Sequence, residues 1–265
     1  MRSYALPDYS VSGEGDTTVY LLHGAYGSKE YWRFTIQFLV QNGYRVIAWD
    51  APGYGVSPVP ETVTIPSLAE VLNRLIAHTR SARTVVLGHS MGGMVAQKAY
   101  DLNPSQIDAL VLSETAHTFN HSGPEWQAEF LRTRVAPLTN GRGIADYAPD
   151  MLRTMMSPGA SGPIVDHVLY NIRLMDEKGF KAAITATSQY LEDEVLARIK
   201  APVLCIAGEL DATCPASVMQ TMAELCGGEF HEMKGIGHYG WAERPDEYHG
   251  VLLDFLQRRV PAGQA

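Results

Sequence analysis

Along most of the chain, short apolar runs alternate with segments whose apolar residues recur at helical spacing. The runs that predict strands are residues 18–22, 84–87, 110–113, 202–207 and 229–233. Two helical stripes are Leu68, Val71, Leu72, Leu75 and Ile76, and then Tyr248, Val251, Leu252, Phe255 and Leu256. This alternation is typical of a mostly parallel central sheet covered by helices on both faces. We therefore predict an α/β fold.

The alternation stops between about His117 and Gln189, where the pattern predicts helices separated by loops. Trp126 and Phe130 share one helical face, and a run of Ser, Pro and Gly at 157–163 predicts a loop in the middle of this region. We expect residues 117–189 to form a helical insertion, a candidate cap. Residues 1–116 and 190–265 would then form one core.

Ser90 stands at the turn between a predicted buried strand and a predicted helix, within the sequence Gly88-His89-Ser90-Met91-Gly92. A strand that turns sharply into a helix strains the backbone of the turn residue, and a glycine two positions to either side leaves the necessary room. The same turn directs the N–H of Met91, at the positive end of the helix, toward the position of a tetrahedral oxyanion. Ser90 is therefore a candidate nucleophile.

A serine hydroxyl needs a base, and the base needs a carboxylate that fixes its tautomer and stabilises its cationic form. Asp211 follows the predicted strand 202–207, and His238 follows the predicted strand 229–233. Both therefore fall at the carboxyl ends of strands, where sites in open α/β sheets are built. We expect His238 to be the base and Asp211 to orient it.

Five segments occur in a characteristic order: Leu21-Leu22-His23-Gly24-Ala25, Asp50-Ala51-Pro52-Gly53-Tyr54-Gly55-Val56-Ser57, Gly88 to Gly92, Gly208-Glu209-Leu210-Asp211 and Gly235-Ile236-Gly237-His238. In these motifs the chain resembles the α/β-hydrolase superfamily over nearly its whole length, and within it most closely the 3-oxoadipate enol-lactonase-like serine hydrolases. The resemblance implies that the N–H of Ala25 is the second oxyanion donor. It also implies that the insertion lies over Ser90 as a cap and shapes the substrate pocket.

Glu114 is a competing acid, because it follows the predicted strand 110–113 and some members of the superfamily carry the triad acid there. The Gly-Glu-Leu-Asp segment with Pro215 behind it matches the commoner position, which favours Asp211.

Several side chains of the insertion are candidates for lining the substrate pocket. The apolar ones are Met151, Met155, Met156 and Met175, for which helix packing is the alternative role. Arg132, Arg134 and Arg153 are candidates for binding a substrate carboxylate, and a solvated charged face is the alternative for each.

These features together predict a serine hydrolase that cleaves a small carboxylic ester or lactone through an acyl-enzyme. One alternative is a carbon-carbon bond hydrolase of ring-cleavage products. That family usually has glycine and proline in its oxyanion loop and Trp directly after the catalytic histidine, whereas this chain has Ala25-Tyr26-Gly27 and Tyr239. A second alternative is a ligand receptor that retains the hydrolase fold and turns over slowly.

Composition narrows the partners to a small-molecule substrate. The 265 residues carry a net charge of −8 without a basic run, which argues against nucleic acid or an anionic membrane surface. No apolar run approaches the roughly 20 residues that span a bilayer, and the N-terminus lacks a signal-peptide pattern. Three cysteines, Cys205, Cys214 and Cys226, lack paired metal-ligand spacing. We expect a cytoplasmic enzyme without cofactor, metal or disulfide framework, while its substrate and oligomeric state stay open.

Overall fold

The computed structural model describes residues 5–119, 123–139, 143–192 and 194–261. Within these ranges, seven strands form one sheet in the order β1-β3-β2-β4-β5-β6-β7. Their bounds are β1 (Tyr9–Ser12), β2 (Thr17–Leu22), β3 (Arg45–Trp49), β4 (Arg83–His89), β5 (Ala109–Ser113), β6 (Val203–Gly208) and β7 (Glu229–Met233). Strand β1 pairs antiparallel with β3, and every other neighbouring pair is parallel. The predicted mostly parallel sheet is confirmed.

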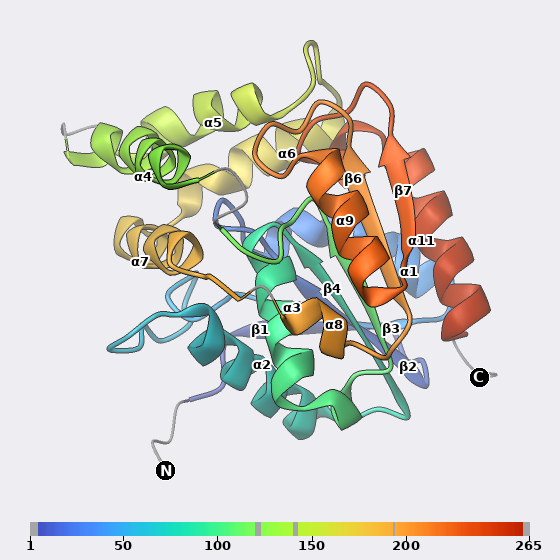
Figure 1. Cartoon of the computed structure of the whole chain (residues 1–265). Coiled ribbons are helices and arrows are strands. Elements are labelled where there is room, and N and C mark those ends of the chain that lie inside the picture. The colour runs from blue at the N-terminus through green and yellow to red at the C-terminus, as the bar shows by residue number, and fades with distance from the viewer. Residues whose placement is uncertain (1–4, 120–122, 140–142, 193, 262–265) are drawn as a thin grey trace.

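Helices cover both faces of this sheet (Figure 1). One face carries α2 (Ile65–Thr79), α3 (Met91–Leu102), α8 (Val195–Arg198) and α9 (Ala216–Cys226), and the other carries α1 (Arg33–Gln41) and α11 (Pro245–Arg259). Short helical turns are η1 (Lys29–Trp32), η2 (Pro104–Gln106) and α10 (Gly240–Glu243). All five residues of the predicted stripe on α2 are buried, as are four of the five on α11, where Val251 is half-buried. Each stripe is the face that packs against the core.

The central strands are buried on both sides, which explains why they appear in the sequence as unbroken apolar runs. Every residue of β2, β5 and β6 is buried. In contrast, β1 at the edge of the sheet is a short half-buried strand with two serines. It has no apolar run from which it could be predicted.

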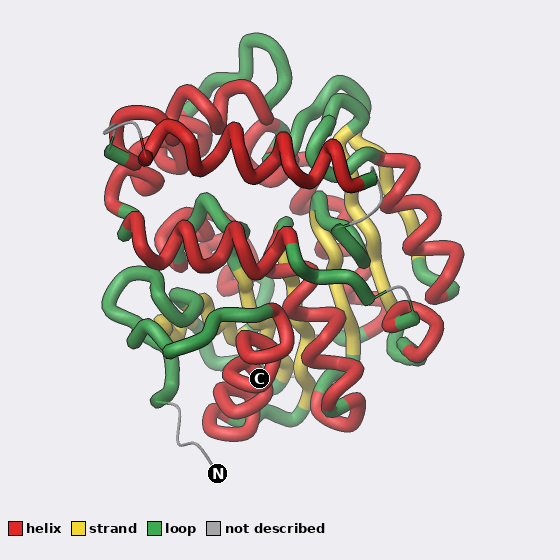
Figure 2. Tube along the Cα trace, turned by 60° about the vertical axis from the view of Figure 1, so that its left-hand side comes forward, coloured by secondary structure: helices red, strands yellow, loops and turns green. Residues whose placement is uncertain are grey.

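The region between β5 and α8 is helical: it contains α4 (Pro124–Thr139), α5 (Ile144–Met155), α6 (Pro163–Asn171), η3 (Ile172–Leu174) and α7 (Glu177–Ser188). These helices gather beyond the end of the sheet toward which β6 and β7 point (Figures 1 and 2). Residues 157–162, between α5 and α6, form the predicted loop. The segments before α4 and after α7 lie side by side. Thr118 and Leu191 form an isolated antiparallel β-bridge, and the N–H of Phe119 donates to the carbonyl of Tyr190 at 2.8 Å.

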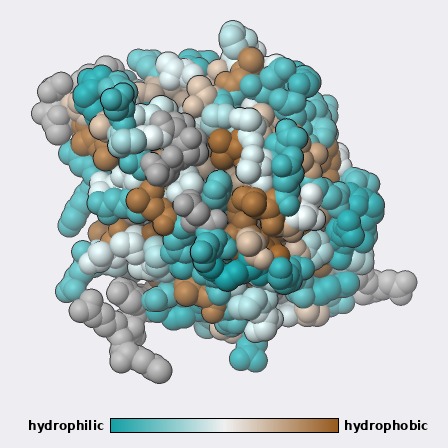
Figure 3. Space-filling model, in the orientation of Figure 1, coloured by the Kyte–Doolittle hydropathy of each residue, from teal (hydrophilic) through white to brown (hydrophobic). Residues whose placement is uncertain are grey.

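Hydrophilic residues cover most of the face seen in Figure 3, and the apolar areas on it are small and separate. Within the described ranges, no helix has the length and apolar character that crossing a bilayer requires.

Candidate active site

Ser90 lies between β4 and α3 with a strained backbone, φ 53° and ψ −120°. Glycine is needed on both sides of it. A Cβ on Gly88 would lie 2.3 Å from the carbonyl oxygen of Gly92, and a Cβ on Gly92 would lie 2.4 Å from the carbonyl oxygen of Leu22. Two further bonds hold the turn: the Ser90 N–H donates to the carbonyl of Ser113 at 3.0 Å, and Thr115 Oγ1 donates to the Ser90 carbonyl at 2.6 Å. The turn therefore presents Ser90 in one fixed position.

The backbone N–H groups of Ala25 and Met91 are the candidate oxyanion donors. Met91 is the first residue of α3, Ala25 follows β2, and both line the same small cavity as Ser90. In the described part of the chain neither N–H meets a hydrogen-bond acceptor. The start of a helix leaves the Met91 donor free, and a second free donor at Ala25 in the same cavity suits a developing oxyanion.

Asp211 and His238 form a hydrogen-bonded pair in the loops after β6 and β7. The Nδ1 atom of His238 lies 2.7 Å from Oδ2 of Asp211, and each side chain is only 1% exposed. The other carboxylate oxygen, Oδ1, accepts the N–H groups of Thr213 at 2.8 Å and Cys214 at 3.0 Å. His238 lines the same cavity as Ser90. The structure thus brings together the three residues that the sequence singled out.

Glu114, the competing acid, lies elsewhere in the network. Its Oε1 atom accepts the N–H of Gly240 at 3.2 Å, and Oε2 accepts the hydroxyl of Ser113. The side chain is completely buried, and this burial raises the pKa of Glu114 well above its ordinary value. The Glu114 carboxyl therefore packs behind the His238 loop and bonds to the backbone there, not to the imidazole itself.

His89 connects the serine turn to the loops on either side of it. Its Nε2 atom lies 2.7 Å from the carbonyl oxygen of His238, which can only accept, so Nε2 carries the proton. The hydroxyl of Tyr31 lies 3.0 Å from Nδ1 of His89 and accepts the N–H of Gly24 at 2.8 Å. Burial lowers the pKa of His89 far below its ordinary value and keeps the ring neutral. These bonds give His89 a role in holding the loops together.

His23 fixes the loop that carries Ala25. Its Nε2 atom accepts the N–H of Ala51 at 2.9 Å, and Nδ1 donates to the carbonyl of Gly24 at 2.8 Å. Burial lowers the pKa of His23, so this neutral tautomer persists.

The cavity beside Ser90 is small, about 20 Å³, which is on the scale of one water molecule. Side chains from α4, α5 and α7 form part of its lining: Phe130, Arg134, Met155, Ile184 and Thr187. Of the four methionines considered above, Met155 lines this cavity. Of the three arginines, Arg134 lines it, whereas Arg132 is exposed and paired with Glu129 at 2.6 Å, and Arg153 is exposed.

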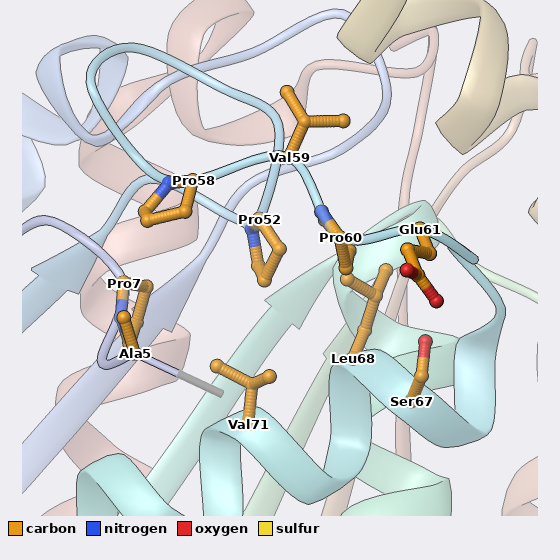
Figure 4. A pocket seen from close by; sticks show the side chains of 10 residues that line it. All are labelled: Ala5, Pro7, Pro52, Pro58, Val59, Pro60, Glu61, Ser67, Leu68 and Val71. Atoms are coloured by element: carbon orange, nitrogen blue, oxygen red, sulfur yellow. The ribbon is translucent and has the colours of Figure 1, made fainter. Parts of the chain in front are cut away.

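A second cavity, about 500 Å³, opens between α2 and the loop after β3 (Figure 4). Its lining is mostly apolar and rich in proline: Pro7, Pro52, Pro58, Pro60, Leu68 and Val71. The hydroxyl of Ser67 in its wall is occupied, because it caps the start of α2 together with Thr64. Since neither Ser90 nor His238 lines this space, we place the chemistry in the smaller cavity.

In the described ranges, one group of residues has the spacing of a metal site. It consists of Asp211, Cys214 and His238, whose ligand atoms all lie within 4.8 Å of one another. Their existing bonds do not fit a metal ion. Both oxygens of Asp211 already accept hydrogen bonds, and burial raises the pKa of the Cys214 thiol, which disfavours the thiolate that a metal needs.

Comparison with known proteins places the chain in a family. The model of the alpha/beta hydrolase fold family matches residues 17–245. The chain belongs to this family. The resemblance inferred from the five segments is confirmed at this level.

Two curated relatives differ in their reactions. An sn-1-specific diacylglycerol lipase from Danio rerio is 25% identical over 261 residues, which cover 92% of this chain and 80% of the relative. A 2-hydroxy-6-oxononadienedioate/2-hydroxy-6-oxononatrienedioate hydrolase from Escherichia coli is 28% identical over 264 residues, which cover 93% of this chain and 89% of the relative. Both are hydrolases, so the comparisons support hydrolase chemistry without selecting one substrate.

Among solved structures, the enol-lactonase from Burkholderia xenovorans LB400 superposes with a TM-score of 0.82 at 22% identity and covers 96% of this chain and 100% of that one. This likeness shows the shared fold.

One residue of the site escaped the sequence analysis altogether. Glu243 accepts the N–H groups of Gly237 at 3.3 Å and Tyr239 at 3.1 Å, which flank His238. It also accepts the N–H of Ser157, from the insertion, at 2.7 Å. A carboxylate shortly before a helix is common in any sequence, so only the fold reveals this contact.

Proposed function

We propose that this protein is a serine hydrolase that cleaves a small carboxylic ester or lactone through an acyl-enzyme. The observation that carries the proposal is the buried Asp211–His238 pair, 2.7 Å apart, beside a serine held at a strained turn. In these roles Ser90 is the nucleophile, His238 the general base and Asp211 its orienting carboxylate. The N–H groups of Ala25 and Met91 form the oxyanion hole.

The first half of the reaction forms the acyl-enzyme. Ser90 Oγ attacks the carbonyl carbon while Nε2 of His238 takes the hydroxyl proton. The negative charge that develops on the carbonyl oxygen is stabilised by the N–H groups of Ala25 and Met91. Asp211 stabilises the imidazolium through the Nδ1–H bond. When the intermediate collapses, His238 protonates the departing alkoxide.

The second half restores the enzyme. Water attacks the acyl-enzyme carbonyl as His238 takes its proton, and the same two N–H groups hold the new oxyanion. The Ser90–acyl bond then breaks, and His238 returns the proton to Ser90 Oγ. An ester yields an acid and a separate alcohol, whereas a lactone yields one hydroxy acid.

We also propose that residues 117–189 act as a cap. Phe130, Arg134, Ile184 and Thr187 belong to α4 and α7, and they enclose the cavity beside Ser90. A space of about 20 Å³ is too small for an ester, so the side chains that line it, or α4 and α7 that carry them, have to move when substrate enters. Their closure afterwards would exclude bulk water from the oxyanion.

The test is hydrolysis of a panel of short phenyl esters and small lactones by the wild-type protein and by Ser90→Ala. Turnover that disappears in the variant, together with an acyl adduct on Ser90 found by mass spectrometry, would support the proposal. A folded wild-type protein that turns over none of them but binds one tightly would instead support a receptor.

Carbon-carbon bond hydrolysis is the second candidate, because one relative bears the name of such an enzyme. The same triad would serve it. Tyr239 after His238 and the Ala25-Tyr26-Gly27 loop depart from the pattern usual in that family, which favours ester hydrolysis. Loss of the absorbance of a conjugated ring-cleavage product, without hydrolysis of any ester, would reverse this preference.

A further inference from the structure

Arg134 places a cation in the wall of the cavity that contains Ser90 and His238. It belongs to α4, and its guanidinium carbon lies 3.8 Å from the centre of the Phe130 ring, one helical turn earlier. This stacking covers one flat face of the guanidinium and leaves its edge, where the N–H groups point, for other partners.

The edge of this guanidinium is poorly satisfied. Its one hydrogen bond to a side chain in the described ranges runs from Nη1 to the hydroxyl of Thr133 at 3.1 Å, and Nε is buried without a partner. No carboxylate of the described residues lies within 4.0 Å of it, whereas the neighbouring Arg132 is paired with Glu129. Arg134 is partly exposed, but its Nε is buried, and a buried donor without an acceptor is costly. Such a site is suited to a ligand that brings an anionic acceptor.

Tyrosine hydroxyls surround Arg134 and hold its backbone. The hydroxyl of Tyr147 donates to the Arg134 carbonyl at 2.8 Å, and the hydroxyl of Tyr26 lies 3.3 Å from that of Tyr147. Burial lowers the pKa of Arg134, and the nearby phenols of Tyr26, Tyr147 and Tyr239 act in the opposite direction. An arginine stays charged under such conditions because its ordinary pKa is so high.

We propose that Arg134 binds a carboxylate of the substrate, so that the ester or lactone cleaved at Ser90 is an anionic one. The inference rests on the proposed function and narrows its substrate class. A carboxylate matches the planar edge formed by Nε and Nη2, and it would satisfy the buried Nε. Arg134 would then fix the distance between this acidic group and the carbonyl that Ser90 attacks.

The experiment compares esters that differ only in a carboxylate. On the acyl side the pair is monophenyl glutarate and phenyl valerate. On the leaving-group side it is 3-carboxyphenyl butyrate and phenyl butyrate. For each, kcat/KM is measured above the uncatalysed rate with the wild-type protein, Arg134→Gln, Arg134→Lys and the control Arg132→Gln, and melting curves verify that each variant is folded.

In at least one pair, we expect the wild-type protein to prefer the anionic ester by roughly 10- to 100-fold, the range for a hydrogen-bonded charge pair. Arg134→Gln should abolish this preference and Arg134→Lys should reduce it, whereas Arg132→Gln should retain it. Turnover of the neutral esters with no preference for the anionic ones in either pair, or a preference that survives in Arg134→Gln, would overturn the inference and leave the proposed function standing.

A binding measurement tests the carboxylate site independently of ester turnover. Monoethyl glutarate is titrated by calorimetry into Ser90→Ala and into the double variant Ser90→Ala/Arg134→Gln. Binding that weakens at least about tenfold in the double variant supports the carboxylate site, even if no ester is hydrolysed. Equal affinity in the two proteins, or binding in neither, counts against it.

Discussion

The carboxylate of Asp211 lies 2.7 Å from Nδ1 of His238, whereas that of Glu114 contacts the backbone of Gly240 two residues further on. Both acids follow neighbouring strands of the sheet and both are buried. Their hydrogen bonds differ in kind. Asp211 touches the imidazole itself, whereas Glu114 contacts the backbone near it and the hydroxyl of Ser113.

This difference predicts unequal effects of two isosteric substitutions. Asp211→Asn removes the charge that orients and stabilises the imidazolium, so we expect kcat to fall on the order of 10⁴-fold. Glu114→Gln keeps an acceptor oxygen for the N–H of Gly240 and does not touch the imidazole, so its loss should be far smaller. Steady-state kinetics of the two folded variants on one ester check the prediction. A larger loss at Glu114 would transfer the role of triad acid to that residue.

The nucleophile and the base should be essential for activity and dispensable for folding. We expect Ser90→Ala and His238→Ala each to lower kcat by at least about 10⁴-fold. Ser90→Ala removes only a hydroxyl at a turn that is held by backbone bonds, so its melting temperature should stay near that of the wild-type protein. Circular dichroism melting and ester kinetics measure the two properties separately. A folded Ser90→Ala protein that retains wild-type turnover would refute the mechanism.

Local patterns in the sequence were enough to predict the turn at Ser90. Gly88 is required by its close approach to the backbone of Gly92, and Gly92 by its close approach to the backbone of Leu22. The first of these contacts joins residues only four positions apart in the sequence. Asp211 and His238 could also be predicted from the sequence. Each follows its strand after a short loop, and parallel strands end at the same edge of the sheet. Their pairing then follows from topology.

Contacts between the insertion and the core could not be predicted in this way. Arg132 and Arg134 are two positions apart on α4, yet one is exposed and the other lines the cavity. The sequence does not reveal which face of α4 turns inward, because that depends on α7 and the His238 loop. Likewise, the bond from the backbone of Ser157 to Glu243 joins residues 86 positions apart.

His249 should make the stability of the protein depend on pH. It is buried, its ring stacks on Phe38 with centroids 4.5 Å apart, and its Nε2 atom lies 3.1 Å from the hydroxyl of Thr35. Burial lowers the pKa of His249 to about 4 in the folded state, from an ordinary value of 6.5. The unfolded chain therefore binds the proton more readily. The contribution of the neutral ring is fully present above pH 6.5 and is lost as the pH falls toward 4.

At about 1.4 kcal/mol per pH unit, this loss amounts to about 3 kcal/mol between pH 7 and pH 4. His249→Gln cannot titrate, so its free energy of unfolding should fall less steeply over the same range. Urea unfolding of both proteins at several pH values measures the difference, and His78→Gln, at an exposed position, controls for the loss of one histidine. Parallel pH curves for the wild-type protein and His249→Gln would contradict the prediction.

Glu243 should position His238 by holding both of its neighbours and Ser157 in the loop after α5. Glu243→Ala removes the acceptor for the N–H groups of Ser157, Gly237 and Tyr239, which are only partly accessible to water. We expect a loss of about 2 kcal/mol in the free energy of unfolding and a fall of about tenfold in kcat, measured well below the melting temperature. Glu243→Gln keeps one acceptor oxygen and should lie between Ala and wild type in both properties. Glu247→Ala is the matched control, because Glu247 pairs with Arg244 and His231 and accepts none of these three N–H groups. Unchanged kcat in a destabilised Glu243→Ala protein would reduce Glu243 to a purely structural residue.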